Sequence, residues 1–179
     1  MMNRKKWEHP DSTGWDQGRR KILRTIKKVV KLQNGKDKVI EYRNPVFEDL
    51  EDIIELLLKF SEEFSDIYPQ AERDRVSFTV DQHYKDGLIY SAYDGEKVVG
   101  SIGAISSAWW FSSKQFVAET WFYVLPEYRS YAIAKELLNK IKEYRRDKTV
   151  LMPVITGLDS PALYERLKFK NMGTMWRYN

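Results

Sequence analysis

The chain has 179 residues, of which 42% are hydrophobic, and it contains no cysteine. This length fits one compact domain with a single core, and the apolar content argues against wholesale disorder. Without cysteine there is no disulfide scaffold, cysteine nucleophile or thiolate zinc site, and with only two histidines no metal site is expected. No apolar run approaches the roughly 20 residues of a membrane span, and no apolar signal segment follows the N-terminus. We therefore expect a soluble, cytoplasmic protein.

The charge is distributed unevenly along the chain. Residues 1–38 contain twelve basic and four acidic residues, a net charge of +8, whereas the whole chain carries +4. The remainder therefore carries −4. A basic arm of this kind can contact nucleic acid, an acidic protein or a membrane surface, and it is equally typical of a solvated leader.

Two segments are predicted within this arm. Residues 1–18 show no sustained periodicity and are expected to be irregular. Residues 19–32 are predicted to form a basic amphipathic helix, since apolar residues recur at helical spacing and Asn34-Gly35 is a typical helix stop. We expect this helix to pack on the rest of the protein, with a partner or an anionic surface as alternatives. The predicted organisation is an extension of residues 1–37 and a domain of residues 38–179.

The predicted elements of the domain alternate between strand and helix periods. A strand at 39–43 is followed by a helix through Leu58, for which Asn44-Pro45 supplies the N-cap and first-turn proline. The further elements are a helix at 71–85, strands at 88–93 and 97–106 around an Asp94-Gly95 turn, a strand at 116–124, a helix at 130–146, a strand at 150–155, a short helix from Ser160-Pro161 and a strand at 172–178. The order βααβββαβαβ predicts an α/β fold.

One run of residues points to anion binding. The sequence Val124-Leu-Pro-Glu-Tyr-Arg129-Ser-Tyr-Ala132-Ile-Ala134 places a turn between a strand and a helix. A helix N-terminus presents free backbone N–H groups and a positive dipole end to an anion, and Arg129 adds a permanent charge. The run therefore predicts a phosphate site at the start of the 130–146 helix.

This run resembles the corresponding motif of the GCN5-related N-acetyltransferase (GNAT) superfamily, and the resemblance extends over about residues 38–179. Arg129 and Ala134 match the family pattern, while Ala132 stands where glycine is usual. The resemblance implies a mixed sheet with splayed central strands, flanked by helices, here with a basic helical extension. It also implies that backbone near Val124 orients the thioester of acetyl-CoA. The pyrophosphate would be bound by Arg129, Ser130, Tyr131, Ala132, Ile133 and Ala134, and Ala132 is expected to weaken this binding rather than abolish it.

A second motif, from Ser160 to Phe169, looks like the closing helix and turn of the same superfamily. The resemblance places Tyr164 on the tyrosine that protonates the departing thiolate, a role that a nearby phenol can fill. A core tyrosine with its hydroxyl at the surface is the alternative interpretation. Lys168 replaces the usual glycine before Phe169, and its effect is expected mainly on the turn.

Glu119 lies five residues before Val124, where several members of the superfamily place a glutamate general base. Alternation predicts that Glu119, Trp121 and Tyr123 share one face of the strand. Beside aromatic residues, the pKa of this carboxylate could be raised enough for it to deprotonate an amine. An exposed strand carboxylate or a salt-bridge partner is an equally good interpretation.

Three further features have less specific signals. Pro153 is costly in a fully paired strand and indicates that its strand diverges from the sheet. The run 109–111 (Trp-Trp-Phe) could line an acceptor entrance or an interface, or be a strand end buried against the first helices. His83 has no recognisable triad partner and reads as an ordinary helix histidine.

The sequence thus predicts an acyltransferase that transfers acetyl from acetyl-CoA to a primary amine by direct attack in a ternary complex. Tyr164 and Glu119 are the predicted acid and base, and no metal is involved. The alternative is a catalytically degenerate protein of this fold whose basic arm contacts nucleic acid or a protein assembly. A homo-oligomer is compatible with either.

Overall fold

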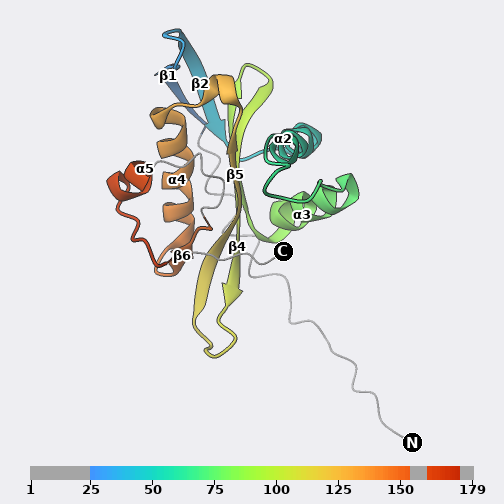
Figure 1. Ribbon diagram of the computed structural model, residues 1–179, viewed down its shortest axis with the longest axis vertical. Coiled ribbons are helices and arrows are strands. Elements are labelled where there is room, and N and C mark those ends of the chain that lie inside the picture. Colours follow the sequence, from blue (N-terminus) through green and yellow to red (C-terminus); the bar gives the residue numbers. More distant parts are fainter. Residues whose placement is uncertain (1–24, 154–160, 174–179) are drawn as a thin grey trace, which may run out of the picture.

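The computed structural model describes residues 25–153 and 161–173, which form one sheet between two layers of helices (Figure 1). The six strands lie side by side in chain order. Neighbouring strands are antiparallel except for the last pair, which is parallel. The strands are β1 (Ile26–Lys31), β2 (Asp37–Arg43), β3 (Leu88–Asp94), β4 (Lys97–Ala108), β5 (Gln115–Val124) and β6 (Thr149–Leu151). The predicted mixed α/β fold is therefore confirmed.

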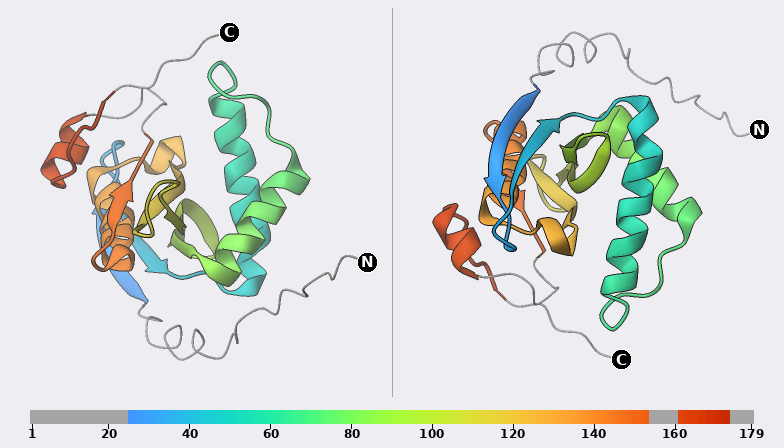
Figure 2. Two further views of the ribbon diagram at one scale, coloured as in Figure 1. Left: turned by 90° about the horizontal axis from the view of Figure 1, so that it is seen from below. Right: turned by 90° about the horizontal axis from the view of Figure 1, so that it is seen from above.

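Helices cover both faces of the sheet (Figures 1 and 2). One face carries η2 (Phe47–Asp49), α2 (Leu50–Glu63) and α3 (Arg73–Asp86). The other carries α4 (Tyr131–Arg145), which packs on β3, β4 and β5, and the short α5 (Pro161–Arg166); η3 (Pro126–Tyr128) joins β5 to α4. Among the described residues, the helices are too short or too polar to cross a membrane. The predicted strand at 172–178 lies mostly outside the described residues.

The prediction of a basic helix over 19–32 is wrong for its second half, and residues 19–24 lie outside the described residues. Residues 26–31 form β1, which pairs along its whole length with β2. Asn34-Gly35 is the hairpin turn, with Gly35 at φ +80° and its N–H donating to the Leu32 carbonyl at 3.0 Å. Asn-Gly between two β-branched runs is a strong hairpin signal, and here it outweighed the helical spacing. The division of the chain at residue 37 stays a prediction.

The start of α2 also differs from its prediction. Val46, not Asn44, occupies the cap position of the preceding η2 turn, and its N–H donates to the Asp49 carboxylate at 2.7 Å. Arg43 donates to the other oxygen of the same carboxylate at 3.0 Å. Burial raises the pKa of Asp49, but these hydrogen bonds outweigh it and hold the pKa below its usual value. The Asp49 side chain, three residues after Val46, therefore caps this segment in place of the expected Asn44.

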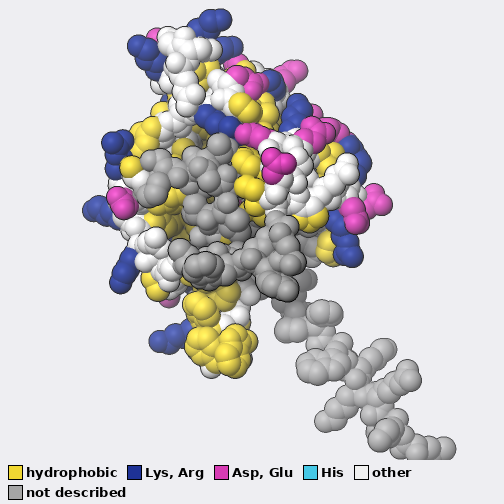
Figure 3. All heavy atoms as spheres, viewed as in Figure 1, with side chains coloured by type: hydrophobic (Ala, Val, Ile, Leu, Met, Phe, Trp, Pro, Cys, Tyr) yellow, Lys and Arg dark blue, Asp and Glu magenta, His cyan; other side chains and the backbone are white. Residues whose placement is uncertain are grey.

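The aromatic run 109–111 forms the tip of the β4–β5 hairpin and is not buried against the first helices. Trp110 is 94% exposed and Phe111 65% exposed, so the tip is an apolar patch that projects from the body (Figure 3). Trp109 packs on Phe116 at the base of the tip, with ring centroids 4.6 Å apart. The interpretation of this run as a buried strand end is therefore wrong.

The centre of the sheet depends on a small residue beneath a large one. The indole of Trp121 on β5 lies directly over Gly103 on β4, and its N–H donates to Ser101 at 3.1 Å. A β-carbon at Gly103 would overlap the six-membered ring of the buried indole. Glycine is therefore required here by close packing rather than by backbone conformation.

We predict that Gly103→Ala destabilises the protein by about 1–3 kcal/mol, the usual cost of overpacking a core. Denaturant unfolding should show a much smaller cost for the same substitution in a Trp121→Leu background, because the opposing ring is gone. Equal costs in both backgrounds would contradict the packing explanation.

Candidate active site

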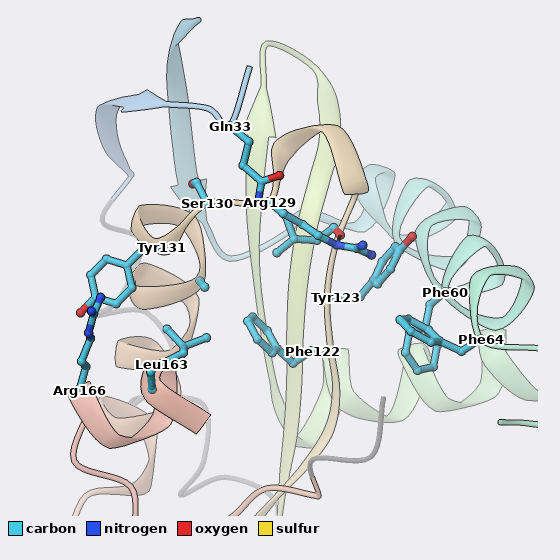
Figure 4. Close-up of a pocket in the computed structure, with 13 residues that line it drawn as sticks. Gln33, Phe60, Phe64, Phe122, Tyr123, Arg129, Ser130, Tyr131, Leu163 and Arg166 are labelled. Atoms are coloured by element: carbon cyan, nitrogen blue, oxygen red, sulfur yellow. Dashed lines mark hydrogen bonds between the residues drawn. The ribbon is translucent and has the colours of Figure 1, made fainter. Parts of the chain in front are cut away.

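A cavity of about 400 Å³ opens where β5 ends and α4 begins, and we call it cavity A (Figure 4). Its walls come from α2, the end of β5, the first turn of α4 and α5. Phe60, Phe64, Phe122 and Leu163 make most of it apolar, and Arg129 and Arg166 contribute two cations. Of the residues predicted to bind the coenzyme, five line this cavity: Val124, Arg129, Ser130, Tyr131 and Ala134.

The first turn of α4 has the polarity that an anion site requires. Ser130 caps the helix, and its hydroxyl accepts the N–H of Ile133 at 3.3 Å. The N–H of Ala134 donates to the Ser130 carbonyl at 3.1 Å. The N–H groups of Tyr131 and Ala132 occupy the first two helical positions, where no partner exists within the helix. The N–H groups that can take an anion are therefore fewer than predicted, because Ile133 and Ala134 bond to Ser130.

Arg129 lies at the cavity but points away from the helix start. Its guanidinium donates to both oxygens of Glu63, at 2.6 and 2.7 Å, and to the Val124 carbonyl at 3.2 Å. It also lies 5.7 Å from the centre of the Tyr123 ring (Figure 4). The Tyr123 hydroxyl donates to Glu63 at 2.8 Å. Only 26% of the Arg129 side chain is exposed, so its charge is already partly engaged within the protein.

Arg166 is a cavity residue that the sequence analysis missed. It extends from α5 over the ring of Tyr131, at 5.8 Å, and so reaches the first turn of α4 (Figure 4). No ion pair joins it to any residue that the structure describes. A signal was present, because Arg166 belongs to the same short motif as Tyr164.

Tyr164 itself turns toward the core. Its ring meets Phe169 edge-on at 5.8 Å, while the α5 residues Ala162, Leu163 and Arg166 face cavity A. Lys168 adopts φ +62°, the left-handed conformation that glycine favours, so its effect falls on the turn as expected. The role of Tyr164 as the acid stays a prediction.

The two parallel strands separate beside cavity A. β5 pairs with β6 only from Phe116 to Ala118, and the last pair is Ala118–Leu151. From Glu119 onward, no described strand pairs with this edge of β5. β6 ends at Leu151, two residues before Pro153, which cannot donate to a ladder. The predicted strand at 150–155 is therefore shorter than expected, and the divergence of its last residues lies outside the described residues.

A β-bulge changes which side chains share a face of β5. Glu119 pairs with Ala104, and Trp121 pairs with Gly103, so Thr120 is an extra residue between them. Directly opposed residues share a face, and Gly103 and Ala104 point to opposite faces. Glu119 therefore lies on the face opposite to Trp121, and the predicted alternation is wrong at this point. Glu119 as a whole residue is 9% exposed, and its role as a base stays a prediction.

A second cavity, of about 340 Å³, lies on the face of the sheet covered by α2 and α3, and we call it cavity B. Thr120 and Trp121 form its floor, and Phe60 is shared with cavity A. Cavity A includes Phe122 and Tyr123, so the two cavities adjoin along β5 just past the separation from β6. Within the described ranges, no group of three or more potential ligands could hold a metal ion.

Behind cavity B lies His83, which is only 4% exposed. One ring nitrogen, Nδ1, is 2.8 Å from the Thr79 carbonyl, and the other, Nε2, is 2.7 Å from the Thr120 hydroxyl. Its ring packs on Trp121 at 4.7 Å. Burial lowers the pKa of His83, although the bond to the Thr79 carbonyl opposes this effect. The histidine is therefore neutral near pH 7, with its ring held at both nitrogens.

Solved structures share this fold. A possible acetyltransferase from Clostridium difficile 630 is 22% identical, with 78% of this chain and 97% of that chain covered, at a TM-score of 0.61. An acetyltransferase from Trypanosoma brucei is 20% identical, with 78% of this chain and 99% of that chain covered, at a TM-score of 0.60. A predicted acetyltransferase from Clostridium acetobutylicum, solved with acetyl-CoA, is 14% identical, with 78% of this chain and 96% of that chain covered, at a TM-score of 0.60. A search of curated proteins found no match.

The sequence itself matches a family model. The match runs over residues 50–169, from the first residue of α2 to the turn after α5, and its description is acetyltransferase (GNAT) family. It therefore includes the separated strands, the first turn of α4 and both cavities' main walls. The chain belongs to the GNAT acetyltransferase family.

Proposed function

We propose that this protein transfers an acetyl group from acetyl-CoA to a primary amine by direct attack in a ternary complex. The observation that supports this most is the separation of β5 from β6 beside a cavity that ends at the N-terminus of α4. An unpaired strand edge offers hydrogen bonds to an extended amide chain, and a helix N-terminus favours phosphate. Both features of a coenzyme A site are thus adjacent.

Residues of cavity A fit the parts of the coenzyme. The N–H groups of Tyr131 and Ala132 would bind the pyrophosphate, and Arg166 would approach it from α5. The edge of β5 between Glu119 and Val124, with which no strand in the described ranges pairs, would hold the pantetheine arm. Acetyl-CoA supplies the activated acyl group, and one structural neighbour was solved with this coenzyme.

The amine would occupy cavity B, on the other side of the separated strands. Because the two cavities adjoin along β5, a nucleophile in one can reach an acyl group in the other. Positioning of this kind supplies much of the acceleration of an acyl transfer. Tyr164 is the proposed acid that protonates the thiolate. Glu119 and the titratable side chains beside cavity B are the candidate bases that deprotonate the amine.

Acetyl-CoA should raise the melting temperature of the protein, because a ligand that binds only the native state stabilises it by mass action. Arg166→Ala should weaken acetyl-CoA binding about tenfold, the effect of losing one charge-assisted contact. Arg145→Ala, at the opposite end of α4, should leave binding unchanged. No thermal shift at millimolar acetyl-CoA, for the wild type or for Ala132→Gly, would overturn the proposed function.

Arg129 can join the phosphate site only if it leaves Glu63. We expect Glu63→Gln to strengthen acetyl-CoA binding several-fold in calorimetric titrations, because it weakens the competing ion pair. The same substitution should cost the free protein up to about 1 kcal/mol of stability, as for a partly exposed ion pair. Glu62→Gln is the matched control, with the same charge change and no expected effect. Weaker binding in Glu63→Gln would show that the pair positions Arg129 instead of sequestering it.

A further inference from the structure

We propose that His83 accepts the proton released by the attacking amine and that the Thr120 hydroxyl carries the proton to it. This inference rests on the proposed acetyl transfer and names the proton acceptor of that reaction. Neither residue was predicted from the sequence to take part.

The two hydrogen bonds of His83 determine its tautomer. A backbone carbonyl can only accept, so the ring nitrogen 2.8 Å from the Thr79 oxygen, Nδ1, must carry the proton. In the neutral ring the other nitrogen, Nε2, then has a free lone pair. The Thr120 hydroxyl, 2.7 Å away, must donate to that lone pair. The oxygen of Thr120 therefore keeps its own lone pairs for a third group.

The place of Thr120 in the fold indicates what that third group is. Thr120 lies two residues beyond the last β5–β6 pair, Ala118–Leu151, where the acyl end of a chain along the open edge would arrive. Thr120 is an exposed residue and lines cavity B. An amine in cavity B that attacks an acyl group at this point would have the Thr120 oxygen within reach.

The proton transfer is balanced. The amine nitrogen forms a bond to the thioester carbonyl carbon, the C–S bond breaks, and the thiolate leaves with the electron pair. One N–H proton of the amine passes to the Thr120 oxygen as the hydroxyl proton of Thr120 passes to Nε2 of His83. Thr120 ends unchanged, and His83 becomes an imidazolium whose Nδ1–H still donates to Thr79. Release of that proton to solvent restores the starting state.

The bulge favours this path over one through Glu119. Because Thr120 is an extra residue, it lies on the cavity B side together with Trp121, while Glu119 lies on the opposite face. The carboxylate is therefore separated from an amine in cavity B by the strand itself. A histidine that is neutral near pH 7 and bonded at both nitrogens is also already oriented to accept a proton.

Few charges surround His83. Cavity B is lined by Arg75 on α3, by Glu72 just before that helix and by Tyr68, and α2 contributes only the uncharged Leu57, Phe60 and Ser61 to it. On β5, Glu119 is adjacent in sequence but on the other face. The ionisable residues of β3 and β4 are Tyr90, Tyr93, Asp94 and Lys97. Burial remains the main cause that lowers the pKa of His83, so the contribution of His83 to the rate should be lost only when the pH falls below the usual range of a histidine.

The test uses the full chain, acetyl-CoA and 2-phenylethylamine, a probe amine whose ring suits the aromatic walls of cavity B. We expect His83→Gln to lower kcat about 10²-fold and Thr120→Val at least tenfold, the range for loss of a general base. The KM for acetyl-CoA should change less than threefold. Thr120→Ser keeps the hydroxyl and should restore most of the activity. His9→Gln and Thr149→Val are matched controls that should behave as the wild type.

Two readouts separate proton transfer from a structural role. The ratio of wild-type to His83→Gln kcat cancels the titration of the amine, and it should fall tenfold per pH unit below the pKa of His83. In the free protein, nitrogen NMR should show the neutral Nδ1–H tautomer, with a shift at Nε2 in Thr120→Val.

Several outcomes would overturn the proposal. This path would be excluded by the Nε2–H tautomer of His83, by a pH-independent ratio of wild-type to His83→Gln kcat, or by full activity of Thr120→Val. If Glu119→Gln were inactive while the His83 and Thr120 variants stayed active, the proton would be assigned to the Glu119 carboxylate. Absence of amine-dependent thiol release from the wild type would overturn it together with the proposed acceptor. Retained acetyl-CoA binding would then show that the coenzyme part of the proposed function still holds.

Discussion

The loss of pairing between β5 and β6 after Ala118 is the constraint on which the rest of the site depends. Buried backbone N–H and C=O groups need partners, so the stretch of β5 after Ala118, with which no described strand pairs, is a place where an extended ligand can bind. Here it faces cavity A, and the strand turns through η3 into α4 at its far end. One topological feature thus provides an open strand edge and a helix N-terminus a few residues apart.

Of the two cations at cavity A, Arg129 is balanced by a carboxylate within the protein itself. Glu63 pairs with Arg129 and also accepts from Tyr123, where burial and this bond raise the pKa of the tyrosine well above its usual range. An arginine with a carboxylate partner costs less to hold against aromatic walls than an isolated cation. The same pairing reduces its attraction for a phosphate, so Arg166 has the greater freedom to meet an anion.

Much of the fold could be predicted, because α2, α4 and the strands from Leu88 to Val124 have strong hydrophobic periods and clear turn signals. β1 was predicted wrongly, since Ile26–Lys31 fits both a helical and a strand spacing and Asn34-Gly35 fits both a helix stop and a hairpin turn. The pairing with β2 shows that the hairpin forms. At the site, the run from Val124 to Ala134 was predictable as a local motif that surrounds one cavity. Glu63 was not, because it reaches Arg129 from 66 residues away.

The bulge at Thr120 shows why the chemistry was harder to predict than the fold. Strict alternation places Glu119 beside Trp121, and one extra residue reverses that relation for every side chain before it. The bulge is held by tertiary contacts, since Thr120 bonds to His83 and Trp121 packs on both His83 and Gly103. None of these contacts has a local signature in the sequence. Packing between α3 and β5 therefore decides which group faces cavity B, the proposed acceptor side. Thr120, bonded to the neutral His83 on α3, lies there instead of the carboxylate that the strand pattern alone would place there.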